Sequence, residues 1–159
     1  MKRGIILGLI LLLLVNVVSA SLVFNELESV YNLGDVITLH ATIGSDSETE
    51  GFLRLYLMCQ GDNKDFYLSP LMLGAGDERT EEVSLFLSRN FLKETKGECR
   101  VRGEFAGDGT SSTDFEISNE ILIDVHMNNT SFDPGQSFDV RGKVTKKMGK
   151  DLKGGWIFL

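Results

Sequence analysis

A stretch near the N-terminus recurs 101 positions later without a gap, and this internal repeat constrains the fold more than any other feature. The first copy is 31–43 (YNLGDVITLHATI), and the second copy is 132–144 (FDPGQSFDVRGKV). In both, an aromatic residue and a turn glycine lead into a segment that alternates as a half-buried strand does. A period of about 100 residues matches one β-sandwich domain. The repeat therefore predicts one module over 21–119 and the start of a second over 120–159.

Short alternating segments separated by turn residues indicate an all-β first module. The predicted strands are 22–24 with 29–31, 36–43, 52–59, 66–73, 82–87, 99–105 and 113–117. Ser88 can cap one or two helical turns over 88–94, which we expect to cross between two sheets. The predicted fold is an immunoglobulin-like antiparallel β-sandwich. A very short linker, 118–120, joins it to a second, similar module that stops within its third expected strand.

Residues 1–20 have the pattern of a secretory signal peptide. A basic start precedes an apolar run over 4–15, and Val18-Ser19-Ala20 has the small-x-small pattern of a cleavage site. Cleavage there would make Ser21 the first residue of the mature chain. The alternative is an N-terminal membrane anchor, because no charged residue occurs over 4–25 and such a run can span a bilayer. Both interpretations predict a secreted or extracellular, cell-surface protein.

The two cysteines are predicted to pair with each other. Cys59 and Cys99 each share strand parity with apolar residues, whereas charged residues occupy the opposite parity, so both sulfurs are expected to point inward. Outside the cytoplasm an even number of cysteines favours a disulfide. Closing a loop of about 40 residues would stabilise the domain by about 4 kcal/mol. Two buried free thiols are the alternative, and the absence of a C-x-x-C motif argues against a redox-active pair.

The chain resembles the tandem immunoglobulin-like or macroglobulin-like modules of exported prokaryotic surface proteins, archaeal ones in particular. The resemblance depends on Tyr31 with Gly34-Asp35, on the segment 132–136 (FDPGQ), on 97–99 (GEC) before a strand, and on 115–118 (FEIS) between modules. It covers nearly all of the chain after the signal segment. These motifs imply sandwich geometry and imply no activity. The first module lacks tryptophan and its cysteines are not at antibody positions, so an antibody-type domain matches poorly.

Histidines and carboxylates are the residue types in this chain that could bind a metal or act in catalysis. His40 and His126 belong to different modules, and we expect both to be solvated surface residues. Asp46, Glu48 and Glu50 alternate loosely as in a calcium loop, but the position of the last EF-hand ligand holds a leucine. A solvated acidic hairpin is therefore the favoured interpretation, particularly since the equivalent loop of the second copy, KKMGK, is basic.

A third polar group, Asp108, Ser111 and Asp114, supplies no more specific pattern. The sequence contains no nucleophile elbow, phosphate-binding loop or dinucleotide motif. We therefore predict no catalytic residues, no metal ligands and no cofactor, and we expect that the protein is not an enzyme.

Two overlapping N-x-[ST] motifs begin at Asn128 and Asn129, in a predicted loop of an exported chain. Either asparagine is a candidate N-glycosylation site.

The charge of the chain limits its partners. With 16 basic against 23 acidic residues and a formal net charge of −7, the chain lacks the concentrated basic surface that binds nucleic acid. We expect a protein or a surface glycan as the partner, and membrane contact only through an uncleaved N-terminal segment. The predicted role is a non-catalytic structural or interaction module of a tandem β-sandwich protein. The alternatives are an accessory module of an exported enzyme whose catalytic domain lies beyond residue 159, and a Ca²⁺-stabilised adhesin.

Overall fold

The structure is a computed structural model, and it describes residues 20–127, 131, 133–135, 137, 139–147 and 150–152. Its elements in chain order are β1 (Ala20–Phe24), β2 (Val30–Asn32), β3 (Val36–Ser45), β4 (Thr49–Cys59), β5 (Asp62–Leu73), β6 (Glu78–Phe86), α2 (Arg89–Leu92), β7 (Gly97–Phe105), β8 (Asp108–Ser111), β9 (Phe115–Ser118), β10 (Ile121–Met127) and β11 (Val140–Lys146).

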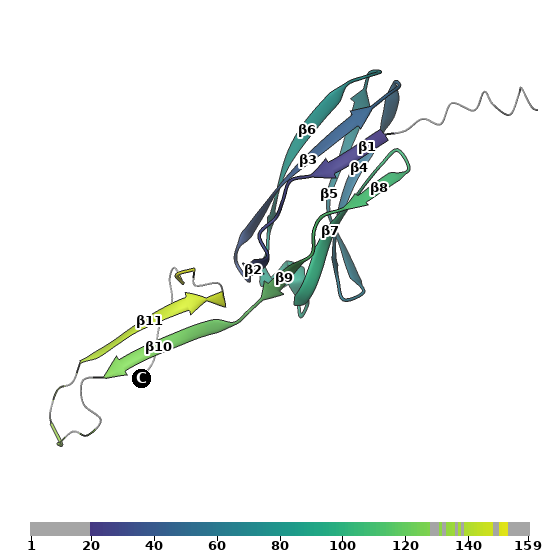
Figure 1. The fold of residues 1–159 in the computed structure, drawn as a ribbon. Helices are drawn as coiled ribbons and strands as arrows, with labels where there is room; N and C mark the ends of the chain where they lie inside the picture. The colour runs from purple at the N-terminus through teal and green to yellow at the C-terminus, as the bar shows by residue number, and fades with distance from the viewer. Residues whose placement is uncertain are drawn as a thin grey trace, which may run out of the picture.

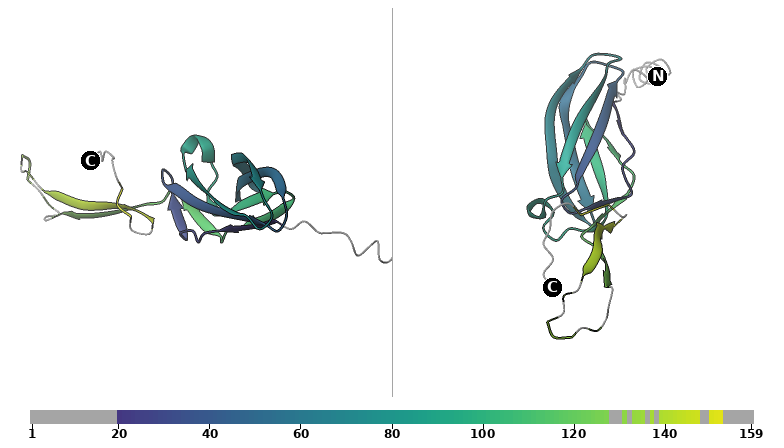
Figure 2. Two further views of the ribbon diagram at one scale, coloured as in Figure 1. Left: turned by 90° about the horizontal axis from the view of Figure 1, so that it is seen from above. Right: turned by 90° about the vertical axis from the view of Figure 1, so that its left-hand side faces the viewer.

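The predicted all-β sandwich is confirmed. One sheet has the strand order β1–β3–β6, and the larger sheet has the order β2–β9–β7–β4–β5, with β8 paired to β7 (Figure 1). A separate two-stranded sheet, β10–β11, extends from the end of the sandwich opposite the start of β1 (Figures 1 and 2). We call β10 and β11 the C-terminal strand pair.

Alternation along the strands places the core between the two sheets. On β3 the inward residues Ile37, Leu39, Ala41 and Ile43 are buried, whereas their chain neighbours face outward. The same parity buries the leucines of β4 and the apolar residues of β7. Since successive strand residues point to opposite faces, a period of two in the sequence was sufficient to identify this core.

The helical turns predicted near Ser88 are also confirmed, as α2. The hydroxyl of Ser88 accepts a hydrogen bond from the backbone N–H of Phe91 at 3.2 Å, which caps the helix start. The helix follows β6, in the smaller sheet, and precedes β7, in the larger sheet. It therefore makes the expected crossing between the sheets.

Two details differ from the sequence prediction. The sequence predicted no strand between 99–105 and 113–117, but Asp108–Ser111 forms β8, with Asp108 opposite Phe105 of β7. The turn itself is Ala106-Gly107, where both residues have positive φ, as the tightest hairpin loops require. In addition, β2 pairs in parallel with β9, so the larger sheet is mixed and not purely antiparallel. The chain passes from the smaller sheet to the larger sheet after β1. This crossing places β2 beside β9, which is far from it along the chain, so no tight turn joins the two strands.

The C-terminal strand pair has the same register as β1 and β3, displaced by 101 residues. Ala20 lies opposite Ser45 in the first pair, and Ile121 lies opposite Lys146 in the second. The turn glycines also correspond, because Gly34 and Gly135 both have a φ of +87°. Such a φ strongly favours glycine, so the same residue type stands where the same backbone conformation occurs.

Candidate functional site

The polar side chains that join different parts of the fold gather where the sandwich meets the C-terminal strand pair, and we call this region the junction. Two residues, Asn119 and Glu120, separate β9 from β10. Two hydrogen bonds of the Lys147 backbone brace this short linker. The N–H of Lys147 donates to the carbonyl of Glu120 at 3.4 Å, and Asn32 Nδ2 of β2 donates to the carbonyl of Lys147 at 3.3 Å.

Three lysines form ion pairs with carboxylates of the sandwich. Lys146 is the last residue of β11, and Lys147 and Lys150 follow it. Lys146 Nζ donates to Asp35 Oδ1. Lys147 Nζ lies 2.8 and 3.0 Å from the two carboxylate oxygens of Glu116. These pairs hold the base of the strand pair against the end of the sandwich.

The third lysine, Lys150 Nζ, contacts the carboxylate of Glu28. Lys147 Nζ also lies 3.7 Å from Glu120 Oε2. The Lys150 and Lys147 pairs are open to solvent, and exposed ion pairs each stabilise a structure by only about 0.2–1 kcal/mol. The Lys146–Asp35 pair is better shielded, with 17% and 16% of the two side chains exposed.

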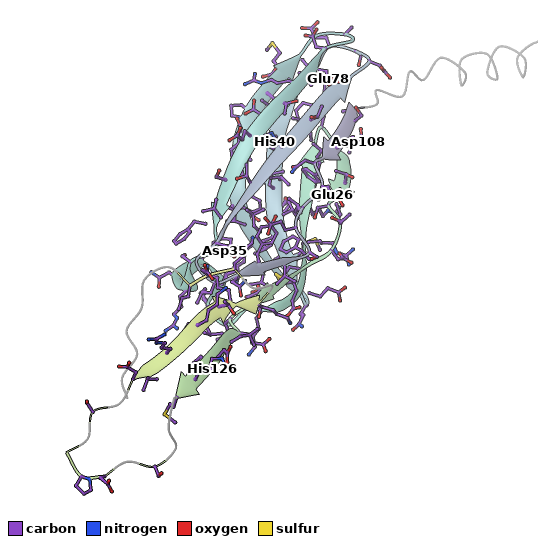
Figure 3. All side chains as sticks on the ribbon, turned by 60° about the vertical axis from the view of Figure 1, so that its left-hand side comes forward. Glu26, Asp35, His40, Glu78, Asp108 and His126 are labelled. Atoms are coloured by element: carbon purple, nitrogen blue, oxygen red, sulfur yellow. A yellow bond between two sulfur atoms is a disulfide. The ribbon has the colours of Figure 1, made fainter. Side chains whose placement is uncertain are left out.

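Asp35 connects the ion pair to the turn that begins β3. Its Oδ2 accepts a hydrogen bond from the backbone N–H of Asn32 at 2.8 Å, while Oδ1 faces Lys146. Figure 3 shows Asp35 at the end of the sandwich next to β11, whereas Asp108 and Glu78 lie toward the other end. The Asp35 carboxylate therefore stabilises its own turn through one oxygen and binds Lys146 of the C-terminal strand pair through the other.

The protonation equilibria reflect this arrangement. Burial disfavours the charged form of Asp35, but hydrogen bonds from Lys146 and the Asn32 amide, with nearby lysine charge, outweigh burial and lower its pKa below 3.8. The hydrogen bond to Glu116 raises the pKa of Lys147 above 10.5, and the hydrogen bond to Glu28 does the same for Lys150. Asp35 therefore stays negatively charged, and Lys147 and Lys150 stay positively charged, over the whole neutral range.

A cleft of about 530 Å³ opens beside the junction. Leu33, Leu92 and Leu152 contribute apolar surface, and Arg89 and Lys146 are among its basic residues. Asn32 also lines it. This side chain is 3% exposed, and its Oδ1 has no hydrogen-bond partner among the residues that the structure describes.

The predicted disulfide is confirmed, in an arrangement the sequence did not specify. Cys59 and Cys99 are bonded, with a Cα–Cα distance of 4.2 Å, and each is 2% exposed. They lie directly opposite each other on β4 and β7, which are neighbours in one sheet. The bond therefore links two strands within a sheet and does not join the two sheets.

The histidines are far from forming a common site. His40 lies on the outer surface of β3, whereas His126 lies in the strand pair, where its Nε2 is 3.2 Å from Asp124 (Figure 3). Asp46, Glu48 and Glu50 are exposed around the turn between β3 and β4.

The remaining polar group is dispersed among structural contacts. Asp108 accepts a hydrogen bond from the backbone N–H of Ala20 at 3.0 Å, and Asp114 forms an ion pair with Arg100 at 3.1 Å. Ser111 pairs with Arg102 in the β7–β8 ladder. Within the described ranges, no group of three or more His, Cys, Asp or Glu side chains could hold a metal ion.

Two predictions concern residues whose positions are outside the described part of the chain. Asn128 and Asn129, the candidate glycosylation sites, are among them, and so is nearly all of the segment 1–20. Ala20, the last residue of that segment, lies in β1 and is 8% exposed. Across the part of the chain that is described, no helix combines the length and apolar character needed to cross a membrane.

Sequence reasoning missed the junction. The basic composition of the 146–150 loop was evident, but nothing in the sequence indicated which carboxylates it would meet. The one indication of the junction in the sequence was a difference in charge. The loop at 46–50 is acidic, whereas the corresponding loop at 146–150 is basic.

No protein-family model and no curated protein matches this chain. A β-glucosidase from Listeria innocua in complex with gluconolactone aligns with 67% of this chain and 17% of its own, at 18% identity and a TM-score of 0.52. The Pseudomonas fluorescens alkylpurine DNA glycosylase AlkC, bound to DNA containing an abasic site analog, aligns with 63% of this chain and 30% of its own, at 22% identity and a TM-score of 0.52.

The chain thus spans less than a third of the length of either of these proteins. At such low identity the similarity shows the fold alone.

Proposed function

We propose that this chain is a non-catalytic, secreted or cell-surface module of a tandem β-sandwich protein, with a structural or interaction role. The observation that carries the proposal is the common register of β1–β3 and the C-terminal strand pair at an offset of 101 residues. A repeated module is expected to repeat both its strand register and its turn conformation, as Gly34 and Gly135 do.

The junction supports a structural role. A two-residue linker leaves little freedom between modules, and the ion pairs of Lys146, Lys147 and Lys150 restrict the remaining freedom further. A scaffold that holds successive domains in line needs connections of this kind, because long flexible linkers would let the domains reorient.

The disulfide supports export. Disulfides persist in oxidising compartments and are rare in the cytosol, so the Cys59–Cys99 bond agrees with the predicted signal segment. On this proposal the module resembles the immunoglobulin-like or macroglobulin-like repeats of prokaryotic surface proteins. Its partner is then a protein or a surface glycan, and any membrane contact passes through the N-terminal segment.

The proposal is tested by locating the protein and its thiols in its native cells. We expect an antibody against residues 20–127 to label intact cells or to detect the protein in the medium, with Cys59 and Cys99 fully oxidised. A cytoplasmic protein serves as the control for cell lysis. Retention in the cytoplasm with two free thiols would contradict the proposal.

A second candidate is an accessory module of an exported enzyme. It is favoured by the similarity to β-glucosidase structures, in which the matching part is only 17% of the chain. The gene downstream of the Leu159 codon distinguishes the two roles. Further copies with a period of about 100 residues would support the scaffold. A domain with catalytic motifs would support the accessory module.

A further inference from the structure

The cleft beside the junction carries positive charge on an acidic protein. The chain has a formal net charge of −7, yet four basic side chains line the cleft against two acidic ones. Lys146 is held by Asp35, but Arg89 of α2 and the exposed Lys93 and Lys96 after it are not held in this way. In the part of the chain that the structure describes, no ion pair includes any of these three residues. Their charges can therefore attract an anionic ligand.

Asn32 gives the cleft a buried polar atom without a partner. Its side chain is directed at the junction, because Nδ2 donates to the carbonyl of Lys147 at 3.3 Å. Only 3% of Asn32 is exposed, and its Oδ1 accepts no hydrogen bond from any described residue. Buried polar atoms in folded proteins are nearly always paired. A hydroxyl or N–H group of a ligand in the cleft would supply the missing donor.

A second hollow adjoins the cleft. The segment 93–96 lines both the cleft of about 530 Å³ and a neighbouring hollow of about 600 Å³. The second hollow adds Lys64 of β5, which pairs with Asp62. Each volume is within the range of about 300–1,000 Å³ that is usual for small-molecule sites. Two hollows with one shared wall suit a ligand of several units that crosses the segment 93–96.

An extended peptide fits this surface poorly. Extended peptides commonly bind by adding a strand to the edge of a sheet, and β2 is the outermost strand of the larger sheet. At Asn32, however, the backbone groups are already used. Its N–H donates to Asp35 Oδ2 at 2.8 Å, and its carbonyl accepts a hydrogen bond from the N–H of Asp35 at 2.9 Å. The cleft instead combines the apolar surface of Leu33 and Leu92 with polar and basic groups, a mixture that suits a sugar with C–H, hydroxyl and carboxylate groups.

We propose that the cleft binds an acidic polysaccharide, whose carboxylates pair with Arg89, Lys93 and Lys96 while a sugar hydroxyl donates to Asn32 Oδ1. This inference rests on the interaction role proposed above and selects a glycan as the partner. Arginine and lysine bind carboxylates through charge-assisted hydrogen bonds. None of the described residues that line the cleft is aromatic, so a sugar ring finds no stacking partner there. Charge should therefore dominate the affinity, and salt should weaken binding.

Isothermal titration calorimetry of the exported protein, with its disulfide formed, tests the proposal. The acidic probes are oligomers of galacturonate and of guluronate, and the neutral control is a galactose oligomer of the same length. We expect an acidic probe to bind and the neutral oligomer not to bind at the same concentration. The affinity should fall at least about fivefold when the salt concentration rises from about 0.05 to about 0.5 M, because the contacts are between exposed charges.

Paired variants show whether binding depends on the cleft. The test variant is Arg89→Gln with Lys96→Gln. The matched control is Arg79→Gln with Arg102→Gln, which removes the same charge from exposed side chains that do not line the cleft. We expect the test variant to weaken binding of the acidic probe at least about fivefold and the control to weaken it less than about twofold.

The side-chain amide of Asn32 gives a readout that requires no substitution. In NMR spectra of the native protein, its Nδ2 resonances should shift when the acidic probe is added, whereas those of Asn25, which does not line the cleft, should not. The proposal is overturned if neither acidic probe binds, if the two paired variants lose equal affinity, or if a polyglutamate peptide binds as tightly as the acidic sugars. These outcomes concern the cleft alone, since the tandem role is tested by cellular location and thiol state.

Discussion

Reducing the Cys59–Cys99 bond should destabilise the sandwich more than any exposed substitution. The bond closes a loop with a sequence separation of 40. In the chain-entropy model, opening a loop of this length returns about 13 cal/mol/K to the unfolded chain, or about 4 kcal/mol at 25 °C. Since small domains are stable by only about 5–15 kcal/mol, reduction should remove between about a quarter and about four-fifths of the free energy of unfolding.

Urea unfolding of the oxidised and the reduced protein measures this difference while both sulfur-bearing side chains stay in place. With a slope of about 1–2 kcal/mol/M, we expect the midpoint to fall by about 2–4 M on reduction. The double variant Cys59→Ala with Cys99→Ala is the control, and its midpoint should not respond to reductant. If the fully reduced protein unfolds within about 1 kcal/mol of the oxidised one, the unfolded chain is already compact and the loop-entropy reasoning fails.

Of four further predictions, three follow from particular contacts and the last from the signal segment. Gly103→Ala should lower the free energy of unfolding by about 1–3 kcal/mol, because its Cβ would lie 2.6 Å from Phe24 Cζ; unchanged urea stability would contradict this. Lys146→Ala should weaken docking of the strand pair by about 1–2 kcal/mol, measured by hydrogen exchange of β11. The contribution of Asp35 to docking of the strand pair is fully present above pH 3.8 and should be lost as the pH falls through its lowered pKa. X-ray scattering of the native protein should therefore show release of the strand pair from the sandwich in acid, and Asp35→Asn should show no such transition. N-terminal sequencing of the exported protein should begin at Ser21, and a start at Met1 would instead indicate the uncleaved anchor.

Local pattern was sufficient for much of the fold. Strand residues alternate between two faces, so the parity of Leu53, Leu55 and Cys59 could be assigned from the sequence before any partner strand was known. The same reasoning predicted that both cysteines face inward, and the structure has both buried. The turn glycine of each copy was also identifiable, because a positive φ strongly favours glycine.

Pairing between distant segments could not be predicted in this way. The alternation of β2 is the same whichever sheet it joins, and its parallel pairing with β9 depends on where the chain crosses after β1. Parity placed Cys59 and Cys99 inside the sandwich but did not tell whether they face each other across the core or lie side by side in one sheet.

The sequence by itself determined the all-β class, the inward positions and the two turn glycines, because these follow from residue type and spacing along the chain. The tertiary structure alone decided the junction. Lys146 and Asp35 are 111 residues apart, and their contact requires both the two-residue linker and the register of β11 against β10. Ion pairs have no period along a sequence, so their partners are fixed only when the fold brings the charges together.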